Sequence, residues 1–227
     1  MTDNYYAKNL NASNLHRVYE TRIERVKRYL DAEIDFVRHG LRGDERILEL
    51  GAGYGRIMKA LAPFAASVTG IDISEDSVAF GREYLADMPN CRIETMDAHA
   101  LAFDADFDVV LCLQNALSAM KGDATDTVAR CVKALVPGGT LYCSSYSAKF
   151  WEHRLAWFRE QADKGLLGAI DEEKTRDGLI VCRDGFVART FSEADLDALG
   201  RASGHPHRVE EVDESSVFLV IEKKETK

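Results

Sequence analysis

The chain has 227 residues, of which 46% are hydrophobic and 30% are charged, a balance that predicts one soluble domain with a buried core. Its formal net charge of −9 argues against a surface that binds nucleic-acid phosphates, and no apolar run approaches the roughly 20 residues that a bilayer-spanning helix needs. The polar start, Met1-Thr2-Asp3-Asn4, lacks the apolar core of a signal peptide, so we expect a cytoplasmic protein with neither nucleic acid nor membrane as a partner.

The cysteines and histidines indicate neither a disulfide framework nor a metal site. The cysteines are odd in number, widely spaced and free of C-x-x-C pairs, as expected in a reducing compartment: Cys91, Cys112, Cys131, Cys143 and Cys182. The one close histidine pair, His205-Pro206-His207, has no third ligand nearby in the sequence. We therefore interpret that pair as part of a loop and expect no bound metal.

Residues 1–40 are predicted to form an N-terminal helical lid. Apolar residues recur every three or four positions from Ser13 to His39, with Ser13 as a suitable N-cap and Gly40 as a natural stop. Aromatic and basic residues are frequent in this segment: Tyr5, Tyr6, Arg17, Tyr19 and Arg22. The alternative is an exposed amphipathic helix with ordinary surface charge.

Strand and helix patterns alternate between residues 41 and 145, which predicts an α/β core with a mostly parallel sheet. Short apolar runs predict strands at residues 46–50, 67–72, 92–96, 107–113 and 140–144. Helical patterns occupy residues 55–62, 74–86 and 123–135. We expect Ser74 to cap the second of these helices, and Pro137-Gly138-Gly139 to follow the third.

Residues 191–227 are predicted to complete the sheet. A helix over residues 192–202 with Ser192 as its cap precedes strands at residues 208–212 and 217–222. Four residues separate these strands, too few for a parallel crossover, so they form an antiparallel hairpin at the sheet edge. The whole sheet then has seven strands.

Residues 146–190 interrupt this order and are predicted to be a cap insertion. A helix-like stretch at residues 155–165 is followed by strand-like runs at 178–182 and 186–190, on either side of Arg183-Asp184-Gly185. Asp-Gly favours a hairpin turn. Because ligands of open α/β sheets bind beyond the carboxyl ends of strands, an insertion after the fifth strand is well placed to cover a site. We expect all four segments to form a single domain, 1–227.

The most informative pattern joins the ends of the first two strands. Glu49 precedes three alternating glycines, Gly51, Gly53 and Gly55, and Asp72 ends a second apolar run about 20 residues further on. Glycines let the backbone approach a ligand, a helix N-terminus favours its anionic end, and a carboxylate accepts ribose hydroxyls. The pattern predicts a nucleoside site. An empty tight turn, and a helix cap for Asp72, are the alternatives.

The G-x-G-x-G spacing, with Glu49 before it and Asp72 after it, resembles motif I of the class I S-adenosylmethionine (SAM)-dependent methyltransferases. The resemblance covers residues 46–145 and, less closely, 191–224. It implies a Rossmann-like sheet with one reversed edge strand, SAM as cofactor, and S-adenosylhomocysteine (SAH) as product. It also implies the cofactor contacts Tyr6, Glu49, Gly51, Ala52, Gly53, Gly55, Asp72, Ile73, Asp97, Ala98, Leu113 and Gln114. Among these, Asp97 is expected near the adenine amino group, with Ile73 and Ala98 flanking the ring.

The resemblance also indicates where an acceptor binds. It places residues 113–116 opposite the transferred methyl, and an N-terminal Arg and Tyr against the SAM carboxylate and sulfonium. The expected acceptor contacts are Tyr5, Asn115, Tyr146, Trp151 and Arg154. By residue type His153 is the candidate general base, with Tyr146 as a second catalytic candidate. The alternative is that these aromatic rings pin the cap to the core and that His153 is a surface residue.

We therefore expect a SAM-dependent methyltransferase that acts on a small molecule, as a monomer or homodimer. The amino-directed nucleic-acid methyltransferases of the family carry an Asn/Asp-Pro-Pro-aromatic motif, which Leu113-Gln114-Asn115-Ala116 does not match. RNA or protein acceptors, and a non-catalytic SAM- or SAH-binding module, remain open. So does an aminopropyltransferase, whereas a dehydrogenase would require G-x-G-x-x-G or a Tyr-x-x-x-Lys pair, and neither stands at the expected place. The sequence does not identify the acceptor atom.

Overall fold

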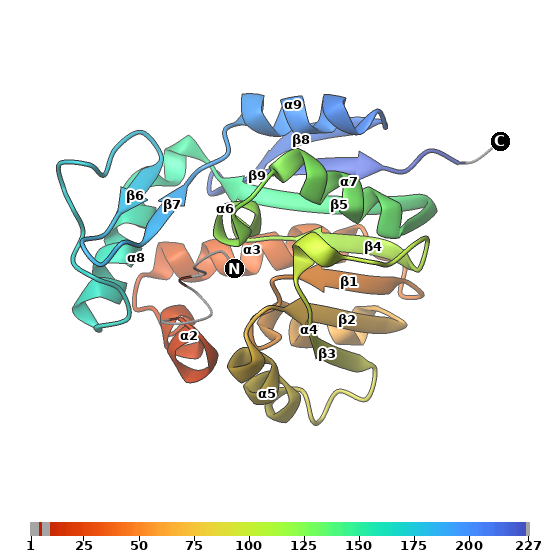
Figure 1. Ribbon diagram of the computed structural model, residues 1–227, viewed down its shortest axis with the longest axis horizontal. Helices are drawn as coiled ribbons and strands as arrows, with labels where there is room; N and C mark the ends of the chain where they lie inside the picture. Colours follow the sequence, from red (N-terminus) through yellow and green to blue (C-terminus); the bar gives the residue numbers. More distant parts are fainter. Residues whose placement is uncertain (1–4, 6–9, 226–227) are drawn as a thin grey trace.

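The computed structural model describes Tyr5 and residues 10–225, and its centre is a seven-stranded sheet with helices on both faces (Figure 1). The strand order is β3-β2-β1-β4-β5-β9-β8. The parallel strands are β1 (Arg46–Leu50), β2 (Ser67–Asp72), β3 (Cys91–Thr95), β4 (Phe107–Cys112) and β5 (Leu135–Tyr146). The predicted Rossmann-like α/β fold is confirmed.

The C-terminal hairpin consists of β8 (His207–Val212) and β9 (Ser216–Glu222), which pair antiparallel as predicted. The reversed strand is not at the edge, however, because β9 lies between β5 and β8 and is antiparallel to both. Burial explains this order. Six of the seven residues of β9 are buried, as suits an interior strand, whereas β8 has no buried residue and suits the edge.

The strand order reverses direction at β1, which pairs with β2 on one side and β4 on the other. The chain leaves β1 toward one half of the sheet and later returns to build the other half. In open α/β sheets this arrangement leaves a crevice at the carboxyl ends of the strands. The ends of β1, β2 and β4 are therefore the place where the fold offers a site.

Three apolar clusters hold the layers together. One face of the sheet packs against α3 (Glu24–His39), α4 (Arg56–Leu61) and α5 (Glu75–Tyr84), and the other against α6 (Ala116–Met120), α7 (Ala124–Ala134) and α9 (Glu193–Ser203). The third cluster joins α2 (Ala12–Tyr19), α3 and the cap, where Tyr29, Phe150 and Phe158 are buried together. The cap thus has an apolar core of its own that is shared with the N-terminal segment.

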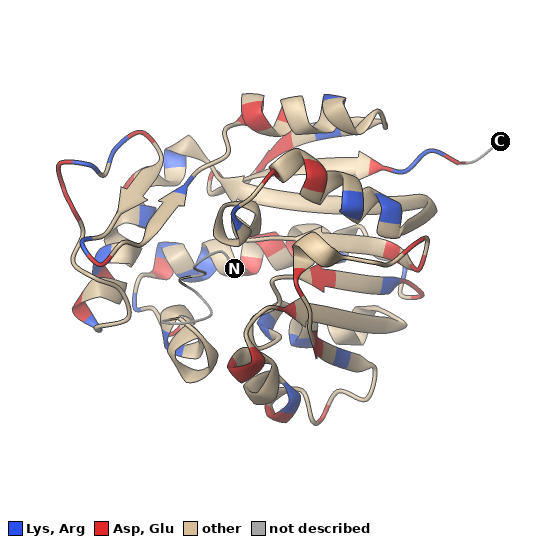
Figure 2. Cartoon of the chain, viewed as in Figure 1, with Lys and Arg blue, Asp and Glu red and all other residues tan. Residues whose placement is uncertain are grey.

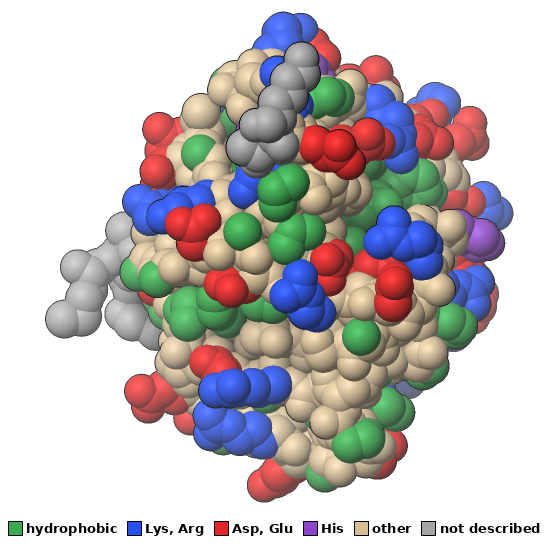
Figure 3. Space-filling model, turned by 90° about the vertical axis from the view of Figure 1, so that its right-hand side faces the viewer, with side chains coloured by type: hydrophobic (Ala, Val, Ile, Leu, Met, Phe, Trp, Pro, Cys, Tyr) green, Lys and Arg blue, Asp and Glu red, His purple; other side chains and the backbone are tan. Residues whose placement is uncertain are grey.

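Charged residues lie on the helices and in the loops around the sheet. Figure 2 shows both signs of charge on α5 and α7, whereas β5 carries no charged residue. Figure 3 shows the end of the molecule at which the parallel strands begin, where acidic, basic and hydrophobic side chains are intermixed. Within the described ranges, every helix is too short or too polar to cross a membrane.

The predicted helix over Ser13–His39 is instead two helices, α2 and α3, separated by residues 20–23. At the break, the Thr21 hydroxyl donates to Glu160 Oε2 at 2.6 Å and the Arg22 N–H donates to Glu160 Oε1 at 3.0 Å. A carboxylate from the cap therefore accepts the Arg22 N–H, which a continuous helix would have bonded internally. Asn11 rather than Ser13 stands at the N-cap of α2.

The remaining boundaries follow the sequence with small shifts. Ser74 and Ser192 cap α5 and α9 as predicted, and β6 (Leu179–Val181) and β7 (Val187–Arg189) form the predicted cap hairpin. The cap helix α8 is Trp151–Asp163, β5 begins before Pro137-Gly138-Gly139 rather than after it, and α6 was not predicted. Short 3-10 helices occupy Ala62–Phe64, Ala98–Ala100 and Ala148–Phe150.

Candidate functional site

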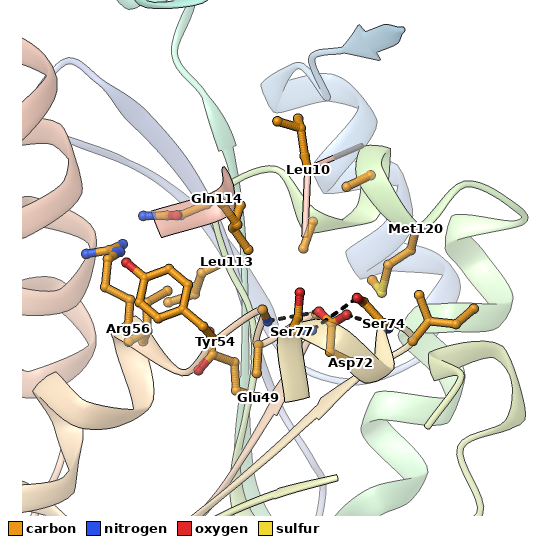
Figure 4. Close-up of a pocket in the computed structure, with 18 of the residues that line it drawn as sticks. Leu10, Glu49, Tyr54, Arg56, Asp72, Ser74, Ser77, Leu113, Gln114 and Met120 are labelled. Carbon is orange, nitrogen blue, oxygen red and sulfur yellow. Dashed lines mark hydrogen bonds between the residues drawn. The ribbon is translucent and has the colours of Figure 1, made fainter. Parts of the chain in front are cut away.

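A pocket opens where β1, β2 and β4 end, and Figure 4 shows part of its lining. Its floor is formed by the glycine turn after β1, by residues 71–74 and 96–99, and by Leu113 and Gln114 after β4. Helices α2 and α8 and the end of β5 form its cover, through Leu15, Tyr19, Tyr146, Trp157 and Gln161 among others. Residues predicted separately in the core, the lid and the cap therefore meet in one cavity.

The glycine turn adopts conformations that favour glycine at each of its three glycines. Gly51, Gly53 and Gly55 have φ values of +67°, +57° and +88°. Gly53 also allows a close approach, because a Cβ there would lie 2.5 Å from Leu15 Cδ2 on α2. Gly51 and Gly53 line the pocket, whereas Gly55 is the N-cap of α4 and lies outside the lining. Because these glycines have no side chain, the pocket and the lid helix α2 both come close to the backbone of the turn.

Asp72 fixes the geometry between the two strand ends. Its Oδ2 accepts the Gly53 N–H and its Oδ1 accepts the Ser74 N–H, each at 2.9 Å. Ser74 is the helix cap, since its hydroxyl accepts the Ser77 N–H at 3.2 Å. Burial raises the pKa of Asp72, and these backbone donors oppose that shift. Each carboxylate oxygen keeps a further lone pair for a ligand in the pocket.

Glu49 and Arg56 place a carboxyl group and a guanidinium in the pocket, and atoms of both have no hydrogen-bond partner within the described residues. Glu49 is 4% exposed, its Oε2 has no hydrogen-bond partner within the described residues, and burial raises its pKa to about 8 against the influence of Arg56. Arg56 Nε and Nη2 likewise have no hydrogen-bond partner in the part of the chain that the structure describes, although the guanidinium lies 4.7 Å from the centre of the Tyr19 ring. Buried polar groups are normally paired, so a ligand with an anionic and a cationic group would complete this pocket.

The other end of the pocket offers a slot for a flat apolar ring. Ile73 is 42% exposed, which is unusual for a large aliphatic side chain in this protein, and it lines the pocket together with Met96 and Ala98. Asp97 lies beside them, where its Oδ1 accepts the His99 N–H at 2.9 Å. His99 Nε2 is 3.1 Å from the Met120 carbonyl oxygen.

The cover of the pocket is aromatic. The Trp157 indole N–H donates to the Val18 carbonyl at 3.1 Å and so joins α8 to α2. Burial raises the pKa of Tyr19 to about 12 and also raises the pKa of Tyr146. These two phenols are therefore neutral near pH 7 and can donate hydrogen bonds to a ligand, but they are poor bases.

Several residues predicted to act in catalysis or to bind the acceptor do not reach the pocket. His153 is exposed on the outer side of α8, because Arg154, Leu155, Trp157 and Phe158 take the inward positions. Arg154 is fully buried and donates to the Gly178 and Ala188 carbonyls and to the Thr190 hydroxyl, so it holds the cap together.

Trp151, Tyr5 and Asn115 also lie outside the lining. Trp151 packs against the cap core, and the Tyr5 hydroxyl donates to Asp184 while its ring contacts Phe186. Asn115 Nδ2 donates to the Arg189 carbonyl at 2.8 Å. Of the two catalytic candidates, Tyr146 alone lines the cavity. Tyr6, a predicted cofactor contact, lies outside the described residues.

The cation of the pocket was missed by sequence reasoning. Arg17 and Arg22 were the expected partners for a ligand carboxylate, but Arg17 Nη2 donates to the Lys164 carbonyl at 3.3 Å and Arg22 is exposed. Arg56 takes that place instead. Its position in the first turn of the helix after the glycine motif was the available signal, since first-turn side chains point back toward the strand end.

The comparisons with known proteins agree with this geometry. Residues 47–139 match a family described as "Methyltransferase domain". The ubiquinone biosynthesis O-methyltransferase of Idiomarina loihiensis is 31% identical over 158 residues, which are 63% of this chain and 59% of the relative. The chain spans about half the length of the curated relatives it matches.

Solved structures share the whole fold. A putative S-adenosyl-L-methionine-dependent methyltransferase from Methanococcus maripaludis superposes with a TM-score of 0.67 at 16% identity, covering 97% of this chain and 95% of that one. The 1,6-didemethyltoxoflavin-N1-methyltransferase of Burkholderia thailandensis, with bound 1,6-didemethyltoxoflavin and SAH, gives 0.64 at 19% identity, covering 99% and 92%. At these identities the likeness concerns the fold.

Gly53→Ala tests the close approach of α2 to the glycine turn. We expect it to lower the free energy of unfolding by about 1 kcal/mol more than Gly165→Ala, because φ is similar at the two positions, +57° and +69°, but the added methyl meets Leu15 only at position 53. Chemical denaturation of both variants measures the difference. Equal losses would show that the Leu15 side chain moves aside at no measurable cost and would contradict a tight contact there.

Proposed function

We propose that this chain, a member of the class I SAM-dependent methyltransferase superfamily, transfers the sulfonium methyl group of SAM to a small-molecule acceptor. The observation that carries the proposal is the convergence in one pocket of the glycine turn, Asp72 and the unsatisfied pair Glu49 and Arg56. Names of relatives point the same way, since the curated ones are O-methyltransferases.

The pocket fits the adenosine half of SAM. In this assignment the free lone pairs of Asp72 accept the two ribose hydroxyls, while its bonds to Gly53 and Ser74 hold the carboxylate in place. Ile73 and Ala98 flank the adenine, and Asp97 accepts a hydrogen bond from its amino group. The exposure of Ile73 supports this role, because a ring stacked on it would cover an otherwise unexplained apolar surface.

The amino-acid half fits the unsatisfied charges. Glu49 Oε2 accepts from the ammonium group, and Arg56 Nε and Nη2 donate to the carboxylate. Both side chains are buried at these atoms, so the ligand returns hydrogen bonds that folding removed. Because the pKa of Glu49 is raised to about 8, an incoming ammonium also favours the charged form of this carboxyl group.

Bound in this way, SAM supplies a methyl carbon that is already activated by the positive sulfur. The protein then has to align the acceptor with that carbon and exclude water. Tyr19, Tyr146 and Trp157 cover the pocket and serve this purpose in the proposed mechanism. His153 lies on the outside of α8, and His99 in the pocket lining has its Nε2 3.1 Å from the Met120 carbonyl oxygen. In this mechanism positioning rather than a histidine base carries the rate.

We also propose that the lid, residues 1–40, and the cap, residues 146–190, select the acceptor. They contribute the aromatic cover that the sheet itself does not supply, and Trp157 and Glu160 of the cap bond to the lid. An acceptor enclosed by neutral phenols and an indole would be a small, largely apolar molecule.

The proposal is tested by incubating the protein with methyl-labelled SAM and a deproteinised bacterial extract. We expect label in a small molecule, and at least about tenfold less label transferred by Asp72→Ala when SAM is below saturation. Label in added RNA or protein would overturn the small-molecule assignment. Binding of SAM without transfer to any fraction would indicate a non-catalytic module.

Asp72→Ala should weaken both SAM and SAH binding by about 1.5–3 kcal/mol, because charge-assisted bonds to the ribose are lost. Isothermal titration calorimetry measures the change. Asp87→Ala is the matched control, since that exposed aspartate pairs with Lys59 on the surface and should leave affinity unchanged. If the two variants bind alike, Asp72 does not hold the ribose.

Arg56→Met should weaken SAH binding at least about tenfold through loss of the charged partner of the carboxylate. It should leave binding of 5′-methylthioadenosine, which has no amino-acid group, within about twofold. Calorimetry with the two ligands separates this role from general damage to the pocket. A parallel loss for both ligands would contradict the assignment of Arg56 to the carboxylate.

A further inference from the structure

Two consecutive residues at the end of β4 have a backbone that normally favours glycine. Gln114 has φ +54° and Asn115 has φ +61°, within the left-handed region. Non-glycine residues persist there when the surrounding structure holds them, and such positions concentrate at functional sites. Gln114 is also part of the pocket lining, so the strained backbone directly supports a side chain at the site.

A buried carboxylate from α3 holds this backbone. The Gln114 N–H donates to Glu33 Oε2 at 3.1 Å and to the Ser144 hydroxyl at 2.8 Å, and Ser216 donates to Glu33 Oε1 at 2.7 Å. Glu33 is 0% exposed and lies 81 residues from Gln114 in the sequence. Burial raises the pKa of Glu33 to about 7, whereas its hydrogen bonds favour the charged form. A buried carboxyl group with these partners fixes Gln114 against α3, β5 and β9.

Asn115 is held by β5 and by the cap hairpin. Its N–H donates to the Ser144 carbonyl at 3.1 Å, its Nδ2 to the Arg189 carbonyl, and its Oδ1 accepts the Ser145 hydroxyl at 2.8 Å. Both residues of the strained pair are therefore clamped. This network accounts for the backbone at Gln114 but not for its side chain.

The Gln114 side chain ends in a buried donor, Nε2, that has no partner within the described residues. A glycine would adopt the same backbone at lower cost, so the backbone alone does not account for glutamine at this place. Figure 4 draws the Gln114 amide on the same side of the cavity as the Arg56 guanidinium. Arg56 and Gln114 both line this pocket, so the two donors share one cavity.

We propose that Gln114 Nε2 and Arg56 together hold the carboxylate of the bound amino-acid end, and that Glu33 is the positioning residue that aims Gln114. This rests on the proposed function, because it assigns a ligand group within the same pocket. Three unpartnered donor atoms, Arg56 Nε, Arg56 Nη2 and Gln114 Nε2, then face an anion that has four lone-pair positions.

Gln114→Gly is the first test, because it keeps the backbone and removes the amide. We expect SAH binding about tenfold weaker, 5′-methylthioadenosine binding within about twofold of wild type, and an unfolding temperature no lower than that of wild type. Asp177→Gly is the matched control, since Asp177 also has positive φ, +52°, but is exposed and outside the pocket. It should change neither affinity.

The second test addresses Glu33. Glu33→Gln keeps an oxygen that can accept the Gln114 N–H and should retain most of the SAH affinity, whereas Glu33→Leu removes it and should lower SAH affinity selectively, about tenfold. In case the leucine variant does not fold, nuclear magnetic resonance of wild-type protein with ¹⁵N-labelled glutamine provides a separate measurement. The Gln114 side-chain amide, identified by its absence in Gln114→Gly, should shift on addition of SAH and not of 5′-methylthioadenosine.

The outcomes separate the two levels of inference. If wild-type protein binds neither SAH nor 5′-methylthioadenosine, the proposed function fails. If it binds both, and Gln114→Gly binds SAH as wild type does, the carboxylate role of Gln114 is overturned alone. Equal SAH affinity in wild type and Glu33→Leu would remove the positioning role. The double variant Gln114→Gly with Arg56→Met should lose less SAH binding free energy than the sum of the two single losses, since both residues hold one group.

Discussion

The turn from β1 into α4 is the constraint on which the rest of the site depends. Residues 51–55 have to reverse the chain where the strand order changes direction, and left-handed glycines make this possible in a short space. The same turn places Glu49 at the end of the strand and Arg56 at the start of the helix, and both side chains line the pocket. It also leaves room above Gly53 for Leu15 of α2. Sheet topology, pocket charges and lid position therefore share one cause.

The unfavourable burial of unpartnered polar atoms is concentrated in the pocket, where a bound ligand can offset it. A buried polar atom without a partner costs about 1–3 kcal/mol, and four such atoms belong to Glu49, Arg56 and Gln114. The apolar clusters on both faces of the sheet and beneath the cap offset this cost through burial, at about 1.5–3 kcal/mol for each large side chain. A ligand that bonds to all four atoms recovers this cost.

Much of the core fold could be predicted because its signals are local. β1 and β2 have the predicted bounds, since each is a buried apolar run closed by a turn, and Ser74 caps α5 as its position before the helix predicts. The break between α2 and α3 was missed because Glu160, which replaces the helical hydrogen bonds there, lies far away in the sequence. The predicted nucleoside-binding positions after β1 and β2 do line one pocket. His153 was misplaced because residue type says nothing about which side of α8 faces inward.

Residues remote in sequence determine how the cover meets the floor of the pocket. Trp157 bonds to the Val18 carbonyl, Glu160 to the break after α2, and Asn115 to the cap hairpin through the Arg189 carbonyl. Each of these bonds joins a segment outside the sheet to another part of the pocket wall. The sheet alone would bind a nucleoside at an open edge, where water reaches the reacting atoms. The lid and cap turn that edge into an enclosed site, and their mutual bonds rather than the sheet set the space left for an acceptor.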